Sequence, residues 1–165
     1  NRSLFFRGAV DKYSWVDIGS SYLPCELQAA YLYAQLEMAD KINEDRLDSW
    51  SAYDQGLQLL ASKGQLQLAN IADDVCHNAH MFYIKLKDLT QRQDLINYLK
   101  EQDIATVFHY IPLHSSVAGS VFSEFRGIDQ FTTKESERLL RLPMYYGLSK
   151  SDIAQVITHI ENFFS

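Results

Sequence analysis

Cysteine is scarce in this sequence, with only Cys25 and Cys76 among 165 residues. Two isolated thiols cannot form the framework of a small disulfide-stapled protein, so we expect reduced cysteines and a cytoplasmic location. No apolar run approaches the roughly 20 residues that span a bilayer, and no basic start followed by an apolar stretch indicates a secretion signal. These absences predict a protein that neither enters a membrane nor is exported.

Basic residues are also in the minority, because 15 Lys and Arg face 21 Asp and Glu and give a net charge of −6. Nucleic-acid-binding proteins normally present a basic face, so we expect no nucleic-acid partner.

A phosphate-binding loop, a dinucleotide fingerprint and a nucleophile elbow are missing as well. The composition, 47% hydrophobic and 22% charged, is typical of one globular domain. Because Asn1 is not an initiator Met, we expect a piece of a longer protein.

The first 23 residues show neither helical nor strand periodicity, and we expect them to form an irregular arm before a domain of residues 24–165. From Pro24 to about Leu60, apolar residues follow helical spacing and predict one long helix or two abutting helices. The apolar stripe changes phase near Asn43, and Gly64 is a natural stop for the helical region.

The rest of the chain mixes strand and helix patterns. Alternating or β-branched side chains predict strands at residues 79–86, 104–110 and 142–145. Capping patterns predict helices that begin at Thr90, Thr132 and Ser149. In the first strand, His80 is expected on a half-buried face with Phe82. Because helices and strands do not alternate regularly, the sequence predicts an α+β fold, a small, mostly antiparallel sheet covered by helices and preceded by a long helix.

Two groups of residues near predicted helix or strand starts are of types that can bind a metal ion or an anion. Cys76, His77 and His80 are of the types that bind zinc, but they cross a transition from loop to strand, which favours a structural histidine over a metal ligand. Ser20 and Ser21 precede a helix start, where hydroxyls and free amides either bind an anion or cap the helix.

The segment from Phe108 to His114 places two histidines and a tyrosine at the end of a predicted strand. Strand ends that run into loops often contact ligands. The alternative is that Tyr110 is part of the core and that His109 and His114 are solvated. From the residues alone, the sequence therefore predicts an α+β module and names no reaction.

Five segments together carry a resemblance to a known family, and they comprise residues 1–8, 13–24, 78–83, 108–114 and 135–143. In order and over essentially the whole chain, they are similar to the DegT/StrS-type sugar aminotransferases. Within that family they resemble the transaminases that convert a dTDP-4-oxo-6-deoxyhexose to the 4-amino sugar in enterobacterial common antigen and lipopolysaccharide synthesis. The resemblance implies a fold-type-I enzyme that uses pyridoxal 5'-phosphate, takes its amino group from glutamate and works as a homodimer.

The resemblance also implies that this chain is only the C-terminal portion of such an enzyme. The family's Schiff-base lysine lies in a larger N-terminal domain, and none of the eight lysines here sits in the family's lysine motif. We therefore expect this chain to contain no catalytic residue, to bind no cofactor by itself and to be inactive alone.

Individual roles are carried over from the positions that match the family's motifs. Ser21 occupies the slot of an Asn that reaches the cofactor phosphate across the dimer, whereas Leu23 stands where relatives have Arg. Arg2 and Arg7 are expected to bind the nucleotide-sugar diphosphate, because a guanidinium matches phosphate geometry. The other expected substrate-binding residues are Tyr22, His109, Tyr110 and His114. No metal ligand is expected.

A competing interpretation is a free-standing α+β binding or interaction module, with or without a metal. A lysine-bearing domain encoded upstream of Asn1 would favour the enzyme, whereas a start codon directly before Asn1 would favour the module. Without its larger domain the chain is also expected to expose apolar surface on its long helix and to self-associate.

Overall fold

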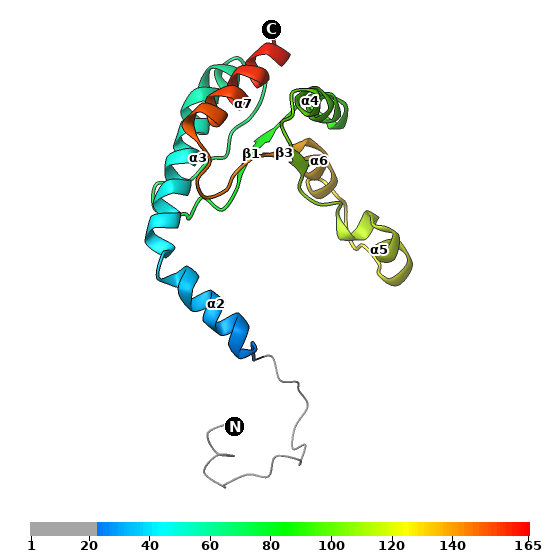
Figure 1. The fold of residues 1–165 in the computed structure, drawn as a ribbon. Helices are drawn as coiled ribbons and strands as arrows, with labels where there is room; N and C mark the ends of the chain where they lie inside the picture. The colour runs from blue at the N-terminus through cyan, green and yellow to red at the C-terminus, as the bar shows by residue number, and fades with distance from the viewer. Residues whose placement is uncertain (1–22) are drawn as a thin grey trace, which may run out of the picture. The chain divides into compact units, whose positions relative to one another are not determined.

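The computed structural model describes residues 23–165, which fall into two compact units, residues 23–37 and Met38–Ser165. The first unit contains α2 (Glu26–Leu36). The elements of the second unit, coloured along the chain in Figure 1, are α3 (Ala39–Ser62), β1 (Phe82–Lys85), α4 (Leu89–Glu101), β2 (Val107–Phe108), the 3-10 turn η1 (Leu113–Ser115), α5 (Val117–Phe122), α6 (Thr132–Arg138), β3 (Leu139–Leu142) and α7 (Lys150–Phe163).

A three-stranded antiparallel sheet forms the centre of the second unit, with β3 between β1 and β2. Phe82 of β1 lies opposite Leu142, and Val107 of β2 lies opposite Arg141. Helices pack around this small sheet, so the predicted α+β class with a mostly antiparallel sheet is confirmed. Of the 17 buried hydrophobic residues within residues 23–165, eight lie on helices and four on the short strands.

The core lies where α3, α4 and α7 meet one face of the sheet (Figure 1). Its fully buried side chains come from all of these elements and include Tyr53, Leu57, Phe82, Ile84, Leu95, Leu99, Leu140 and Ile160. Burying one such side chain contributes roughly 1.5–3 kcal/mol, so this shared cluster is the main source of stability. Gly56 lets α3 approach α7 closely, because a Cβ there would lie 2.5 Å from Cδ1 of Ile157.

The long helical region consists of two helices, which is one of the two predicted alternatives. The break lies at Glu37 and Met38, however, and not near Asn43 as the change of phase predicted. Polar residues near Asn43 do not interrupt α3, because they lie on its exposed side while Tyr53 and Leu57 keep one face buried. Gly64 follows the end of α3 with a φ of 71°, as a helix stop requires.

Asp88, and not the predicted Thr90, caps α4, because its carboxylate accepts a hydrogen bond from the backbone N–H of Gln91 at 3.0 Å. At α6 the cap residue Phe131 makes no side-chain cap bond, and the carboxylate of Asp129 accepts a hydrogen bond from the backbone N–H of Thr133 in the first turn. A carboxylate satisfies these free N–H groups and also complements the positive end of the helix dipole, so it replaces a nearby hydroxyl. The predicted cap of the last helix is confirmed, because the hydroxyl of Ser149 accepts from the N–H of Asp152.

The strands are shorter or shifted relative to the predictions. β1 begins only at Phe82, because Ala79 has a φ of 48° that turns the backbone and leaves His80 exposed, so a half-buried strand position for His80 is wrong. The third strand is Leu139–Leu142 instead of residues 142–145. Pro143 has no N–H to continue the ladder, which explains why the strand ends before it.

Candidate functional site

The structure describes only some of the predicted site residues. Arg2, Arg7, Ser21 and Tyr22 lie outside the described residues, so their roles stay predictions. His109, Tyr110 and His114 all lie between the end of β2 and η1. This segment, residues 109–114, is therefore the part of the expected substrate pocket that the structure describes.

His109 and Tyr110 pack against each other at the end of β2. Their rings meet edge to face with centroids 4.7 Å apart. The Tyr110 side chain is 69% exposed, and its carbonyl accepts a hydrogen bond from the hydroxyl of Ser136. Nδ1 of His109 is buried without a hydrogen-bond partner. The pair thus has one exposed phenol and one buried imidazole nitrogen without a partner, so the alternative in which Tyr110 is part of the core is wrong.

His114 is held by a partner that the sequence did not suggest. Its Nε2 lies 3.0 Å from the carboxylate of Asp129, and its ring packs 4.4 Å from that of Phe125. The hydroxyl of Thr133 donates to the same carboxylate oxygen at 2.5 Å, and this hydrogen bond holds the pKa of Asp129 below its ordinary value. An ionised Asp129 favours the proton on Nε2 of His114 and leaves Nδ1 for another partner.

Only part of the predicted cluster comes together. Across residues 23–165, no hydrogen bond or ring contact joins His114 to His109 or Tyr110. Asp129 and Thr133 are the residues that sequence reasoning missed. Asp129 lies three residues before the start of α6 and Thr133 lies in its first turn, where free N–H groups attract a carboxylate, and this signal could have located them.

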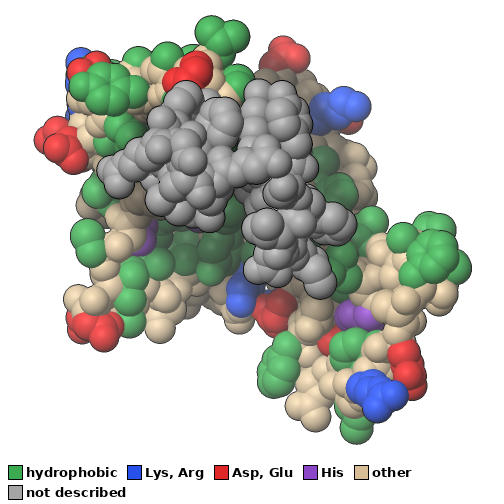
Figure 2. All heavy atoms as spheres, turned by 90° about the horizontal axis from the view of Figure 1, so that it is seen from below, with side chains coloured by type: hydrophobic (Ala, Val, Ile, Leu, Met, Phe, Trp, Pro, Cys, Tyr) green, Lys and Arg blue, Asp and Glu red, His purple; other side chains and the backbone are tan. Residues whose placement is uncertain are grey.

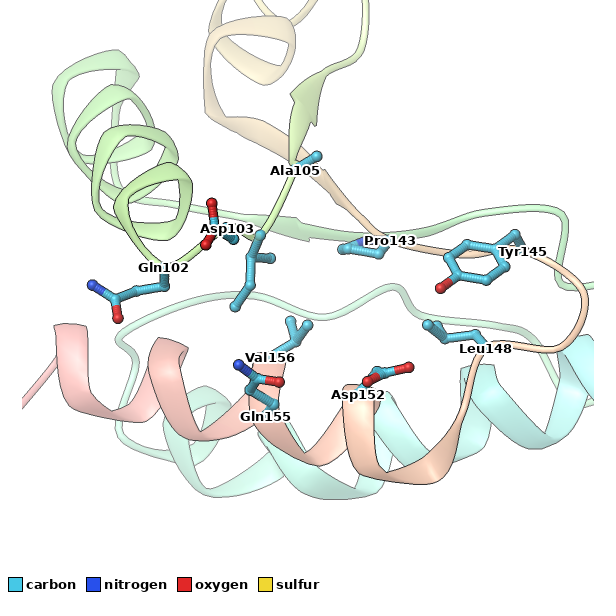
Figure 3. A pocket seen from close by; sticks show the side chains of 10 residues that line it. Gln102, Asp103, Ala105, Pro143, Tyr145, Leu148, Asp152, Gln155 and Val156 are labelled. Atoms are coloured by element: carbon cyan, nitrogen blue, oxygen red, sulfur yellow. The ribbon is translucent and has the colours of Figure 1, made fainter.

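One cavity lies away from these residues. It has a volume of about 560 Å³, and Figure 3 shows side chains from the end of α4 opposite those of α7. Its lining consists of Gln102, Asp103, Ile104, Ala105, Pro143, Tyr145, Leu148, Asp152, Gln155 and Val156. Two carboxylates and no cation line it, so its charge does not suit a nucleotide diphosphate.

A smaller cavity, of about 250 Å³, is lined by basic instead of acidic side chains. It is lined by His80, Met81, Ala105, Val107, Arg141, Leu142, Pro143 and Met144. An arginine, a histidine and no carboxylate line this second cavity. Its charge therefore suits an anion, and its volume is below the roughly 300–1,000 Å³ of pockets for drug-sized ligands.

Residues 23–165 contain neither a metal-binding cluster nor a membrane-spanning helix. Among those residues, no group of three or more His, Cys, Asp or Glu side chains is arranged to hold a metal ion. Cys76 is exposed, and the His77 ring packs on Trp50 with centroids 4.8 Å apart. Within residues 23–165, no helix combines the length and apolar character needed to cross a membrane.

The described residues do not by themselves fit pyridoxal phosphate. That cofactor requires a lysine for covalent attachment, and neither of the two cavities is lined by one. Lys85, on the sheet, is instead paired with Glu135 at 2.8 Å. No step of a reaction is therefore derived through the cofactor from residues 23–165.

Much apolar surface is exposed on both units. In α2 the exposed side chains are Leu27, Tyr31, Leu32, Tyr33 and Leu36. Between β2 and α6 they include Tyr110, Ile111, Leu113, Val117, Val121, Phe122, Phe125, Ile128 and Phe131, and Figure 2 shows hydrophobic side chains on the lobe that carries α5. Apolar surface of this extent is typical of faces that another protein surface covers.

Comparisons with known proteins give one consistent result. The sequence profile of the DegT/DnrJ/EryC1/StrS aminotransferase family matches residues 2–161. The chain is 27% identical over 141 residues to the dTDP-3-amino-3,6-dideoxy-alpha-D-galactopyranose transaminase of Aneurinibacillus thermoaerophilus, covering 84% of this chain and 36% of that protein. It is also 27% identical to the GDP-perosamine synthase of Escherichia coli O157:H7, covering 100% of this chain and 44% of the relative.

The fold agrees with the sequence comparisons. The crystal structure of S. venezuelae DesV superposes with a TM-score of 0.77 and 25% identity, covering 98% of this chain and 42% of that one. This chain thus spans well under half the length of the two curated relatives and of the solved structure.

Proposed function

Because the chain belongs to the DegT/DnrJ/EryC1/StrS aminotransferase family, we propose that it is the C-terminal portion of a pyridoxal-phosphate-dependent nucleotide-sugar aminotransferase. The observation that carries this proposal is the family match over residues 2–161, which leaves almost none of the chain outside the family pattern. The proposed reaction converts a dTDP-4-oxo-6-deoxyhexose to the 4-amino sugar, with glutamate as the amino donor, in lipopolysaccharide or enterobacterial common antigen synthesis.

The names of the relatives support a nucleotide sugar as the substrate class. One relative is named for a dTDP-linked amino sugar and the other for a GDP-linked one. The choice of dTDP for this chain therefore rests on the resemblance of its motifs, and it requires a direct test against a GDP sugar.

The residues proposed in the N-terminal arm are expected to bind anions. Ser21 is proposed to bind the cofactor phosphate, and Arg2 and Arg7 the diphosphate of the nucleotide sugar. Tyr22 completes this arm, which spans residues 1–23 and precedes the small domain of residues 24–165. Hydroxyl and guanidinium groups suit these anionic partners.

His109, Tyr110 and His114 are proposed to border the sugar. The exposed Tyr110 side chain offers a hydrogen bond to a sugar hydroxyl, and the ring of His109 packs against it edge to face. Asp129 fixes the orientation of His114, so that its second ring nitrogen is available to a ligand. Covalent attachment of the cofactor is assigned to the rest of the enzyme.

A second subunit is the proposed partner. The exposed apolar side chains of α2 and of residues 107–131 support this proposal, because burying them would stabilise an assembly. The chain by itself is therefore expected to self-associate at high concentration, and a strictly monomeric sedimentation profile there would count against this.

The test compares the full reading frame that encodes this chain with residues 1–165 alone. Each protein is incubated with pyridoxal phosphate, L-glutamate and either a dTDP- or a GDP-linked 4-oxo-6-deoxyhexose, and the amino sugar is measured by anion-exchange chromatography. We expect turnover by the full protein with the dTDP sugar and none by residues 1–165. Turnover by residues 1–165, or a reading frame without a lysine-bearing upstream domain, would overturn the proposal in favour of a free-standing module.

A further inference from the structure

Arg141 makes a single hydrogen bond within residues 23–165. The bond runs from a terminal guanidinium nitrogen to the carbonyl of Phe108 at 3.5 Å, the outer limit for such a bond. Nε of Arg141 is buried and has no partner. A guanidinium carries five N–H donors, so most of the hydrogen-bonding capacity of this side chain is unused.

Arg138 and Arg46 differ from Arg141 in this respect, because Arg138 pairs with Glu135 at 3.0 Å and Arg46 donates to two carbonyls. Arg92 shares the buried, unpartnered Nε and donates to the carbonyl of Ser136, but it lines neither of the two cavities described above. Across residues 23–165, no carboxylate lies within ion-pair distance of Arg141. Its positive charge is therefore not balanced by the described part of the chain.

The cavity beside Arg141 has the size and the charge to take a small anion. Its volume is about 250 Å³, and it is lined by His80 and Arg141 together with apolar residues and no carboxylate. A partly buried, unpaired charge destabilises a fold unless a ligand supplies the opposite charge. A carboxylate meets this need with two parallel hydrogen bonds to the guanidinium fork.

The walls of the cavity are held in place before any ligand arrives. Arg141 lies on the central strand, in register with Tyr83 on one side and Val107 on the other. Arg46 holds the turn that carries His80, because its Nε donates to the carbonyl of Ala79 at 3.1 Å and a terminal nitrogen donates to that of His80. Such preorganisation lowers the entropic cost of binding.

We propose that this cavity binds the carboxylate of a small organic acid through Arg141, with His80 as a further hydrogen-bonding group, and that the acid is the amino donor. The identity of the acid as amino donor rests on the proposed function, whereas carboxylate binding by this chain does not. Nothing in the proposed diphosphate or cofactor contacts uses Arg141.

The experiment follows the Nε–H signal of Arg141 in ¹H–¹⁵N spectra of isotope-labelled residues 1–165 during titration with sodium L-glutamate. Sodium chloride at equal ionic strength controls for screening, and inorganic phosphate serves as the rival anion. We expect saturable shifts of Arg141 Nε–H and of the His80 backbone amide with glutamate. Arg141→Met should weaken binding about tenfold or more, because a charge-assisted pair is lost, and Arg141→Lys should weaken it less.

Arg126→Met is the matched control, because Arg126 is 86% exposed and lies 3.4 Å from Glu124. It should bind glutamate as the unmodified chain does. Arg141→Met should melt at the same temperature or higher, since it removes an unpaired charge, which separates loss of binding from loss of fold. Linear shifts matched by sodium chloride, tighter binding of phosphate than of glutamate, or full affinity in Arg141→Met would each overturn the proposal. Glutamate binding without transamination by the full reading frame would support the site and overturn the proposed function alone.

Discussion

The carboxylate of Asp129 lies 3.0 Å from Nε2 of His114, and the same oxygen accepts a hydrogen bond from the hydroxyl of Thr133. This one side chain therefore connects η1, the loop after α5 and the first turn of α6. The connection orients a histidine that we place beside the sugar, and it does so in a segment with few buried residues. The stability of this segment consequently depends on polar contacts.

Asp129→Asn should remove part of the acid sensitivity of the chain. The folded-state pKa of Asp129 is lowered, first by the Thr133 hydroxyl, so its stabilising effect is present above the ordinary value of about 3.9. That effect is lost as the pH falls through the lower folded-state value. Thermal melts between pH 7 and pH 2 should show a smaller loss of stability in the variant. Asp73→Asn, at an exposed aspartate without a hydrogen bond, should follow the unmodified chain; equal acid sensitivity in both variants would contradict the role of Asp129.

Tyr53→Phe should leave the chain as stable or make it more stable at neutral pH, by on the order of 1 kcal/mol, because the Tyr53 hydroxyl is buried without a partner. Burial also raises the pKa of Tyr53 in the folded state. The folded chain therefore loses stability as the pH rises above about 10, which is the ordinary pKa of a tyrosine in the unfolded chain. Tyr53→Phe should not show this alkaline loss.

The matched variant Tyr53→Ala separates the ring from the hydroxyl. The ring stacks on Phe82 with centroids 5.1 Å apart, so its removal should cost about 3–5 kcal/mol in urea unfolding. A marked destabilisation by Tyr53→Phe would show that the hydroxyl has a partner, such as a bound water.

Gly56→Ala should destabilise the contact between α3 and α7. The new Cβ would lie 2.5 Å from Cδ1 of Ile157, and such overpacking costs about 1–3 kcal/mol. Alanine gains roughly 1 kcal/mol in helix propensity over glycine, so the clash equals or outweighs this gain. Ile157→Val removes the clashing methyl group. The double variant should therefore be more stable than the sum of the single effects by at least about 0.5 kcal/mol. Additive effects in urea unfolding would show that α7 moves away instead.

Arg46→Met should loosen the turn before β1. Arg46 donates to the carbonyls of Ala79 and His80, and Ala79 is held at a φ of 48° that is unfavourable for an L-residue. Loss of these charge-assisted bonds should cost about 1–3 kcal/mol. Hydrogen exchange should accelerate at residues 79–82, whereas Lys41→Met on the same helix should not change it. Unchanged exchange in Arg46→Met would show that the turn is held by its own packing.

Much of the fold could be predicted from local patterns, because helix formation depends on periodicity within a few turns. The buried faces of α4 and α7, with Leu95, Leu99 and Ile160, follow directly from helical spacing. The cap at Ser149 was predictable for the same reason, since its partner Asp152 lies three residues away. Strand boundaries were not, because the position of β3 depends on β1 and on Pro143.

The sequence by itself determined the α+β class, the helical faces and, through its motifs, the family expectation. All of these depend on residues that lie close together in the sequence. Only the tertiary structure decided which side chains meet across long stretches of chain. Asp129 reaches His114 from 15 positions away, and Arg141 lies beside the His80 turn with its charge unbalanced. Such relationships arise when β3 pairs with both neighbours and the loops close over the sheet, and periodicity carries no information about that closure.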